Sequence, residues 1–199
     1  MAALDGKVVA IVCRGSEADR AIAVALAEAG ADLALATISG SQGEEFATAS
    51  IANEVWAIGR EQFNTVFAAS DPAAAASFAA EVVDRLGRCD AAVIATGGVP
   101  ALDFDEFSAD EWEPIAREGL TGAMIAAQAL GRVIERGGGG RVVFVVDAAP
   151  HGDVAGGVIA EGQRAMAANM GMAWAGRGVR VIAVSRDGAP DQVVNALSK

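Results

Sequence analysis

A chain of 199 residues with 53% hydrophobic residues and 24 glycines can bury one substantial core, which suits a single domain over residues 1–199. Its formal charge of -11 repels nucleic acid phosphates and anionic membrane surfaces, so we expect neither as a partner. The first residues, MAALDGK, lack the basic and apolar regions of a signal peptide, and no apolar run is long enough for a membrane span, so we expect a cytoplasmic protein.

The predicted strands are short apolar runs that alternate with longer, alanine-rich segments of helical spacing. Strands are expected at residues 7–12, 32–36, 64–68, 90–95, 141–146 and 179–185. Helices are expected at residues 18–29, 44–61, 72–86, 109–136 and 158–175. Continuous apolar strands are typical of a parallel sheet that is buried on both faces. The order therefore predicts a doubly wound parallel sheet between two helical layers, a three-layer α/β/α fold.

Local signals mark several helix ends. The sequence Ser70-Asp71-Pro72 predicts a cap followed by proline in the first turn, and Ser108 is expected to cap the longest helix. Glycines are expected to end three helices, at Gly30, Gly87 and Gly137. The two cysteines, Cys13 and Cys89, lack CxxC spacing, so we expect reduced, buried thiols and no metal site.

Six segments together resemble the short-chain dehydrogenase/reductase (SDR) family in their residue sequences and in their order along the chain. They are LDGKVVAIV, RAIAVALAEAGADLALA, RLGRCDAAVIATGG, DEWEPIAREGLTGAMIAAQAL, GGGGRVVFVV and GRGVRVIAVS. The resemblance covers residues 4–187 and implies a Rossmann-like fold and NAD(P)-dependent hydride transfer. Family members usually continue beyond the last of these strands, so the resemblance also implies a chain that is truncated at its C-terminus.

The first turn departs from the family's Thr-Gly-x-x-x-Gly-x-Gly motif, which lies over residues 12–19. Cys13, Glu17 and Asp19 stand where the resemblance places glycines, and the two acids would repel a diphosphate at the helix N-terminus. Thr37 stands where an acid would hold the NAD ribose, and no arginine there suits a 2'-phosphate. We therefore expect no cofactor, with NAD(P) as the alternative. Weak binding candidates are Arg14, Gly15, Ser16 and Gly97.

Three further interpretations of this turn remain open. Glu17 and Asp19 are also explained as ordinary acids that stabilise the first turn of a helix. The turn of Arg14, Gly15 and Ser16 can offer backbone N–H groups to a smaller anion. Cys13 is a candidate nucleophile at a helix N-terminus, although nearby acids raise a thiol pKa and favour simple packing.

The family's catalytic residues are a Tyr, a Lys four residues later, a Ser and an Asn. The chain contains no tyrosine, and the resemblance places Gly119 at the Asn position, Asp147 at the Ser, Ala160 at the Tyr and Arg164 at the Lys. We therefore expect no catalytic residue at these positions. The Asn-Asn-Ala-Gly segment that lines the family's adenosine pocket reads IATG at residues 94–97, and Arg186-Asp187 replaces the Pro-Gly after the sixth strand.

These losses favour a non-catalytic structural or regulatory subunit of an oligomer. The first alternative is an NAD(P)-dependent oxidoreductase with an atypical cofactor site. The second is a non-redox lyase or hydrolase that uses Asp147 and His151, with Asp153 and Glu161 nearby at the carboxyl ends of the strands.

Two helices are the expected assembly surface, since family members commonly pair through the helices after the fourth and fifth strands. Here these are residues 112–136 and 158–175, which are rich in Ala, Gly and Met. The alternative is that their apolar faces only pack on the sheet. We expect a homo-oligomer, or a hetero-oligomer with an active SDR paralogue. Candidate interface residues are Met166, Met170, Met172 and Trp174.

Overall fold

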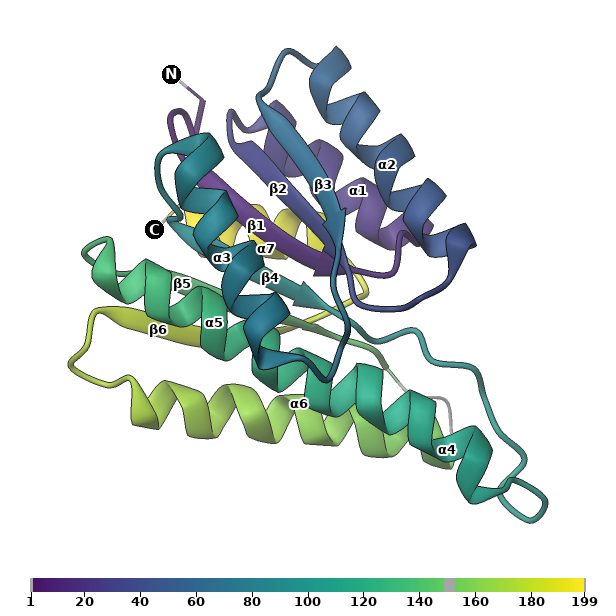
Figure 1. Ribbon diagram of the computed structural model, residues 1–199. Helices are drawn as coiled ribbons and strands as arrows, with labels where there is room; N and C mark the ends of the chain where they lie inside the picture. The colour runs from purple at the N-terminus through teal and green to yellow at the C-terminus, as the bar shows by residue number, and fades with distance from the viewer. Residues whose placement is uncertain (1, 149–152, 199) are drawn as a thin grey trace.

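The structure is a computed structural model that describes residues 2–148 and 153–198. Six strands form one parallel sheet in the order β3-β2-β1-β4-β5-β6 (Figure 1). The strands are β1 (Val8–Cys13), β2 (Asp32–Thr37), β3 (Gln62–Val66), β4 (Ala91–Ala95), β5 (Gly140–Val146) and β6 (Val179–Ser185). This order confirms the Rossmann-like doubly wound sheet that the alternating pattern predicts.

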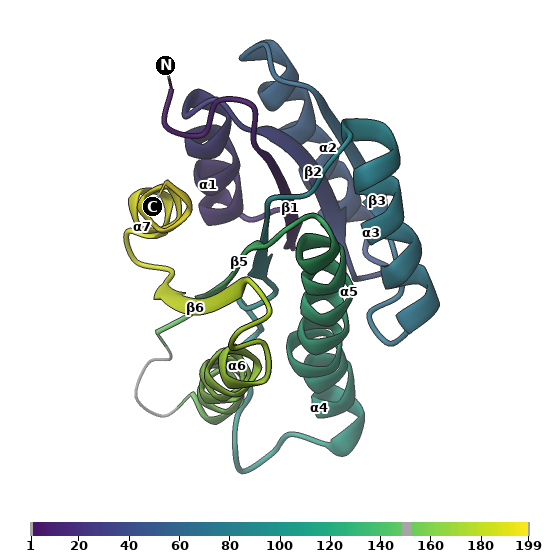
Figure 2. The same cartoon turned by 90° about the vertical axis from the view of Figure 1, so that its left-hand side faces the viewer.

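Helices cover both faces of the sheet (Figure 2). The helices are α1 (Glu17–Glu28), α2 (Gln42–Ala57), α3 (Pro72–Leu86), α4 (Ala109–Ala116), α5 (Ala123–Arg136), α6 (Val154–Ala173) and α7 (Ala189–Leu197). Side chains of α1, α2 and α7 pack in the core on one face, and those of α3, α5 and α6 pack in the core on the other. All six residues of β1 are buried because both of its faces are covered.

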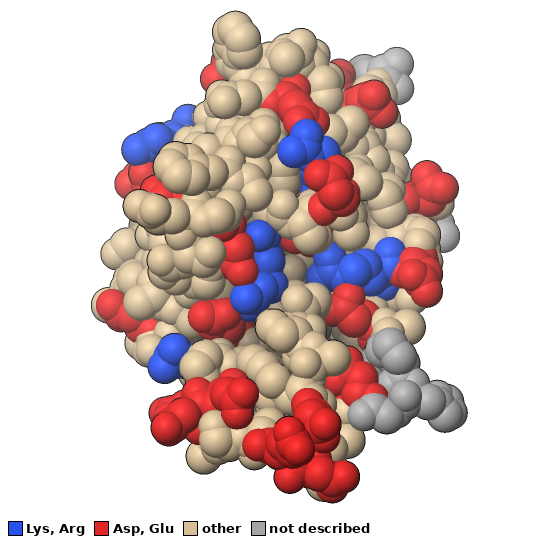
Figure 3. Space-filling view, turned by 90° about the vertical axis from the view of Figure 1, so that its right-hand side faces the viewer, with Lys and Arg blue, Asp and Glu red and all other residues tan. Residues whose placement is uncertain are grey.

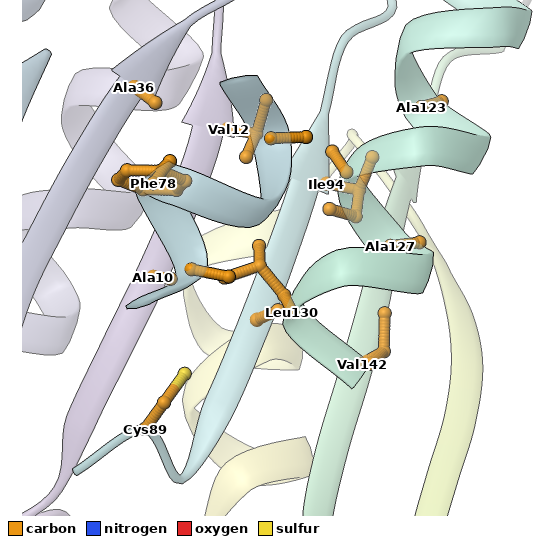
Figure 4. Close-up of a cluster of buried hydrophobic side chains, with 14 of the residues drawn as sticks. Ala10, Val12, Ala36, Phe78, Cys89, Ile94, Ala123, Ala127, Leu130 and Val142 are labelled. Carbon is orange, nitrogen blue, oxygen red and sulfur yellow. The ribbon is translucent and has the colours of Figure 1, made fainter. Parts of the chain in front are cut away.

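Figure 4 shows part of the second core, in which Leu130 of α5 and Phe78 of α3 lie over Ala10 and Val12 of β1 and Ile94 of β4. Alanines of the strands and helices bring the layers close together, and Leu130 and Ile94 are fully buried.

Most predicted helix ends agree with the structure, and the exceptions have local causes. Asp71 caps α3 by accepting hydrogen bonds from two backbone N–H groups, and Ser108 and Glu111 form a reciprocal capping box at α4. Helix α6 begins four residues earlier than expected, because the Asp153 carboxylate accepts a bond from the Gly156 N–H at 2.8 Å. Helix α2 ends at Ala57, short of the expected residue 61, before the left-handed Gly59. Helix α7, which has Pro190 in its first turn, was not predicted from the sequence.

The segment expected as one helix over residues 109–136 is helical throughout but contains a π-helical stretch, η1 (Arg117–Gly122), between α4 and α5. Pro114 lies just before it and provides no backbone N–H. Within η1, a Cβ atom at Gly119 would lie 2.9 Å from Ile159 Cγ2 of α6, so only glycine allows this approach without a shift. None of the helices in residues 2–148 and 153–198 combines the length and apolar character needed to cross a bilayer.

Both cysteines are buried and free. Burial, reinforced by the Asp19 carboxylate, raises the pKa of Cys13 from 9.0 to about 12. Burial and Asp90 raise the pKa of Cys89 to the same value. A protonated thiol with no exposed surface is a poor nucleophile, which favours the interpretation of Cys13 as a packing residue.

We predict that neither thiol of the folded protein reacts with Ellman's reagent at about pH 8, and that both react once denaturant unfolds the chain. The free energy of unfolding should also fall as the pH rises from 9.0 towards about 12, because only the unfolded chain ionises readily in that interval. Rapid modification of a thiol without loss of circular dichroism would contradict this burial.

We predict that Gly131→Ala destabilises the protein by about 1–3 kcal/mol, because the added methyl group would overlap the Trp174 ring across the α5–α6 contact. Gly171→Ala is the matched control, since a Cβ there meets its nearest atom at 3.6 Å and alanine favours the helix by about 0.5–1 kcal/mol. Chemical denaturation of both variants measures the difference. Equal stability of the two variants would show that the Trp174 side chain can move aside without a loss in the free energy of unfolding.

Candidate functional site

The crevice at the carboxyl ends of β1 and β4 is the expected ligand site, because the strand order reverses between these two strands. On the corresponding face of the molecule, basic groups near the middle are bordered by acidic groups (Figure 3). Two arginines, Arg14 after β1 and Arg186 after β6, form ion pairs there with carboxylates from other elements.

Asp19 lies in the first turn of α1 and is buried at this edge of the sheet. Its Oδ2 accepts hydrogen bonds from the backbone N–H groups of Ser16 at 3.0 Å and Arg14 at 3.3 Å. The Ser16 hydroxyl in turn accepts a bond from the Asp19 N–H at 3.2 Å, which completes a capping box. Asp19 is only 1% exposed, whereas the Glu17 side chain is 89% exposed. The interpretation as ordinary first-turn acids therefore fits Glu17, while Asp19 has specific partners.

Arg186 lies between two carboxylates. Its Nη1 donates to Asp19 Oδ1 at 2.9 Å, and its Nε donates to Asp147 at the end of β5. Burial lowers the pKa of the Arg186 guanidinium, but the charges of Asp19 and Asp147 outweigh burial and raise the pKa above its ordinary value. Asp147 also accepts a hydrogen bond from the Gly98 N–H, in the loop after β4. This cluster therefore links the carboxyl ends of four neighbouring strands.

Arg14 forms a second cluster with Glu44 of α2 and Glu118 of η1, each at 2.8 Å. Glu44 also accepts hydrogen bonds from the hydroxyls of Thr37, at the end of β2, and Ser39. Thr37 was predicted at this strand end from the sequence, whereas Glu44 was not. No spacing rule could have identified it, because it reaches the strand end from the next helix.

A hollow of about 350 Å³ opens beside this second cluster, over the ends of β2 and β3. Its walls are mostly apolar, with Arg117 and Glu118 at one side. The lining residues are Ile38, Ser39, Gly40, Val66, Phe67, Ala68, Ala69, Ser70, Arg117 and Glu118. A hollow of this size suits a flat aromatic group better than a whole dinucleotide, which would extend into the crevice.

The two glycines predicted for the cofactor site, Gly15 and Gly97, both lie too close to neighbouring atoms to accept a side chain without a shift. Gly15 has φ +75°, and a Cβ there would approach Ala47 of α2 at 2.7 Å. A Cβ at Gly97 would overlap the Asp147 carboxylate. The structure thus brings the four weak candidates, Arg14, Gly15, Ser16 and Gly97, to the same crevice, but internal carboxylates already contact this part of the chain.

The positions that correspond to the family's catalytic residues carry little acid–base chemistry. Ala160 is buried in the core, and Gly119 is buried in η1. Arg164 reaches the Asp147 carbonyl oxygen at 3.3 Å and also pairs with Glu161. Gln163, which the sequence analysis missed, is fully buried and donates to Thr96 Oγ1 at 3.1 Å and to the Gly119 carbonyl at 2.9 Å.

Three residues of the lyase or hydrolase alternative have partners of their own in the structure. Asp147 pairs with Arg186, Asp153 caps α6, and Glu161 pairs with Arg164 on the surface. His151 lies outside the described residues. Within residues 2–148 and 153–198, no group of three or more His, Cys, Asp or Glu side chains is placed to hold a metal ion.

The sequence model of a family described as enoyl-(acyl carrier protein) reductase matches residues 19–194. Among solved structures, a short-chain type dehydrogenase/reductase from Mycobacterium marinum is 19% identical, with a TM-score of 0.86, over 98% of this chain and 88% of that chain. Carveol dehydrogenase from Mycobacterium avium, in complex with NAD, is 23% identical, with a TM-score of 0.83, over 93% of this chain and 72% of that chain. A comparison with curated proteins gave no match.

The NAD-bound structures correct the expectation that no cofactor is bound. Besides the carveol dehydrogenase, a short chain dehydrogenase from Mycobacterium paratuberculosis was solved bound to NAD; it is 19% identical, with a TM-score of 0.83, over 98% of this chain and 82% of that chain. These relatives hold NAD in the fold that this chain shares, so replaced glycines in one turn were insufficient ground for excluding a cofactor. Because the family model covers most of the chain and the fold agrees, the protein belongs to the short-chain dehydrogenase/reductase family.

Proposed function

We propose that the protein is an NAD(P)-binding oxidoreductase of the SDR family with an atypical cofactor site, in which guanidinium groups replace the glycine-rich turn. The observation that carries this proposal is the presence of Arg14 and Arg186 at the crevice where doubly wound sheets bind nucleotides. Planar guanidinium groups bind phosphate oxygens well. The NAD-bound relatives support the same cofactor class.

The residues present offer a dinucleotide two guanidinium groups and an apolar hollow, but each guanidinium group is paired with two carboxylates and the backbone cradle is occupied. Arg14 and Arg186 are the cations that a diphosphate would meet, each in exchange for a carboxylate partner, and the apolar hollow beside Phe67 suits an adenine ring. The N–H groups of Arg14 and Ser16, in contrast, already bond to Asp19. We therefore infer weaker binding than a glycine-rich turn provides.

Glu44 is the residue proposed to face the ribose. Its carboxylate lies at the end of β2, where it already accepts hydrogen bonds from the Thr37 and Ser39 hydroxyls. A carboxylate accepts bonds from ribose hydroxyls but repels a 2'-phosphate, so this position favours NAD(H) over NADP(H).

The bound nicotinamide would supply hydride transfer. Near the family's catalytic positions, Arg164 can stabilise negative charge on a substrate oxygen, but a guanidinium group does not serve as a proton donor. A second candidate is a dinucleotide-binding subunit without hydride transfer. It is favoured by Ala160, which is buried where the family's tyrosine stands, and by the absence of tyrosine from the sequence.

We further propose assembly through the outer faces of α5 and α6, as a homo-oligomer or with an active SDR paralogue. A groove of about 320 Å³ runs between these helices, and Met124 on its border is 47% exposed. Of the residues suggested by the sequence, Met172 is 69% exposed, whereas Trp174 is 7% exposed and Met166 and Met170 pack partly against the core. Met124 and Met172 are therefore the interface residues we propose.

Calorimetric titration tests the cofactor proposal. We predict saturable binding of NADH at or below about millimolar concentration, near 4 kcal/mol of binding free energy, and weaker binding of NADPH. Glu44→Gln should reduce the difference in affinity between NADH and NADPH, because it removes the charge that repels a 2'-phosphate. The matched control is Glu45→Gln, which changes an exposed neighbour.

Absence of saturable binding for both dinucleotides would overturn the proposal. Saturable binding without NADH oxidation by any carbonyl substrate in a panel would favour the non-catalytic candidate, since the cofactor site would be present and the proton donor absent.

We predict that Met124→Asp and Met172→Asp lower the mass measured by light scattering after size-exclusion chromatography, because a charge in an apolar interface opposes association. Phe46→Asp is the control, since Phe46 is 71% exposed on α2, a helix outside the proposed interface. A mass that neither methionine variant changes would argue against these helices as the assembly surface.

A further inference from the structure

Three hydrogen-bond donors from different parts of the chain converge on the carboxylate of Asp19. Two are the backbone N–H groups of Arg14 and Ser16, at 3.3 and 3.0 Å from Oδ2. The third is Nη1 of Arg186, at 2.9 Å from Oδ1. Backbone N–H groups before a helix together with a guanidinium group are the donors that bind phosphate oxygens in proteins. The chain therefore holds a complete set of anion-binding groups around one of its own carboxylates.

The burial of Asp19 shows that this arrangement is specific. Asp19 is 1% exposed, and a buried carboxylate is stable only when it is paired and hydrogen-bonded. Glu17 has the same charge in the same helical turn, but its side chain is 89% exposed and its cation, Arg20, lies 3.6 Å away. Mere acidity of the first turn therefore does not account for the position of Asp19.

Arg186 has one further donor, which is not used by Asp19. Nη2 of Arg186 is buried and has no hydrogen-bond partner among the described residues, although Nη1 and Nε are both bound to carboxylates. Asp147 would keep Arg186 in place if Asp19 moved away, because it holds Nε from β5. The guanidinium group can thus exchange one anion for another without leaving the crevice.

We propose that Asp19 is an internal competitor of the cofactor's phosphates: its carboxylate occupies their binding groups, and a dinucleotide binds only by displacing it. The inference deepens the proposed function, since it names the residue that limits the affinity of that site. Removal of the Asp19 charge frees two N–H groups and Nη1 of Arg186 for a phosphate group. The same removal at Glu17 frees none of them.

Calorimetry with two probes, inorganic pyrophosphate and NADH, tests this inference. The variants are Asp19→Asn, Asp19→Ser and, as the matched control, Glu17→Gln. We expect both Asp19 variants to bind each probe about tenfold more tightly than the natural chain. Glu17→Gln should change the affinity less than about threefold, as expected from one exposed charge. Serine provides a second, smaller replacement in case asparagine prevents folding, which circular dichroism would reveal.

The two probes separate the two claims. Equal changes for the Asp19 variants and Glu17→Gln, or no gain at Asp19, would overturn the internal competitor, even if NADH binds to every form. A tenfold gain for pyrophosphate at Asp19, with no NADH binding to any variant, would support the competitor and overturn the dinucleotide proposal. Gains for both probes would support both.

Discussion

The ion pairs of Arg186 with Asp19 and Asp147 are the interaction that joins the carboxyl ends of four of the six strands. They join the end of β6, the edge strand, to α1, the helix after β1. A hydrogen bond from the Gly98 N–H to Asp147 adds the loop after β4. Loss of one partner from a buried ion pair costs about 3–5 kcal/mol, and Asp19 is the buried partner. The residues that decide what the crevice can bind are therefore also residues that stabilise the fold, so selection on either property acts on both.

The fold was predictable because its signals are local and repeated. Strands such as β1 and β4 are continuous apolar runs, and the caps at Asp71 and Ser108 follow common rules. The misses have physical causes as well. Helix α7 was hidden because a short segment after a proline reads as a turn. The early start of α6 depends on one carboxylate that folds back on the backbone, a contact with no periodicity.

The site was predictable only in its location. The sequence placed Arg14, Ser16 and Asp147 at strand ends, but it could not show that Asp19 turns inward while Glu17 turns outward. Nor could it show that Glu44 reaches the end of β2 from another helix. Such side-chain contacts depend on distances in the folded chain. The same distances decide whether an acidic side chain excludes a phosphate group or only occupies the phosphate site until a ligand displaces it. A motif comparison, which counts residues in one turn, led to the wrong expectation about the cofactor.

The π-helical segment Arg117–Gly122 affects which substitutions this helical region can accept. An ordinary α-helix fixes all its side chains in one angular register, so a rotation that improves one end disturbs the other. The wider turn separates the two ends: Glu118 faces Arg14, while Leu130 and Ile134, beyond the turn, keep their direction towards the sheet. The extra residue of the π-helical turn therefore lets the two helical segments hold different angular registers. The portion beside the crevice can be retuned by substitution while the portion inside the core stays aligned.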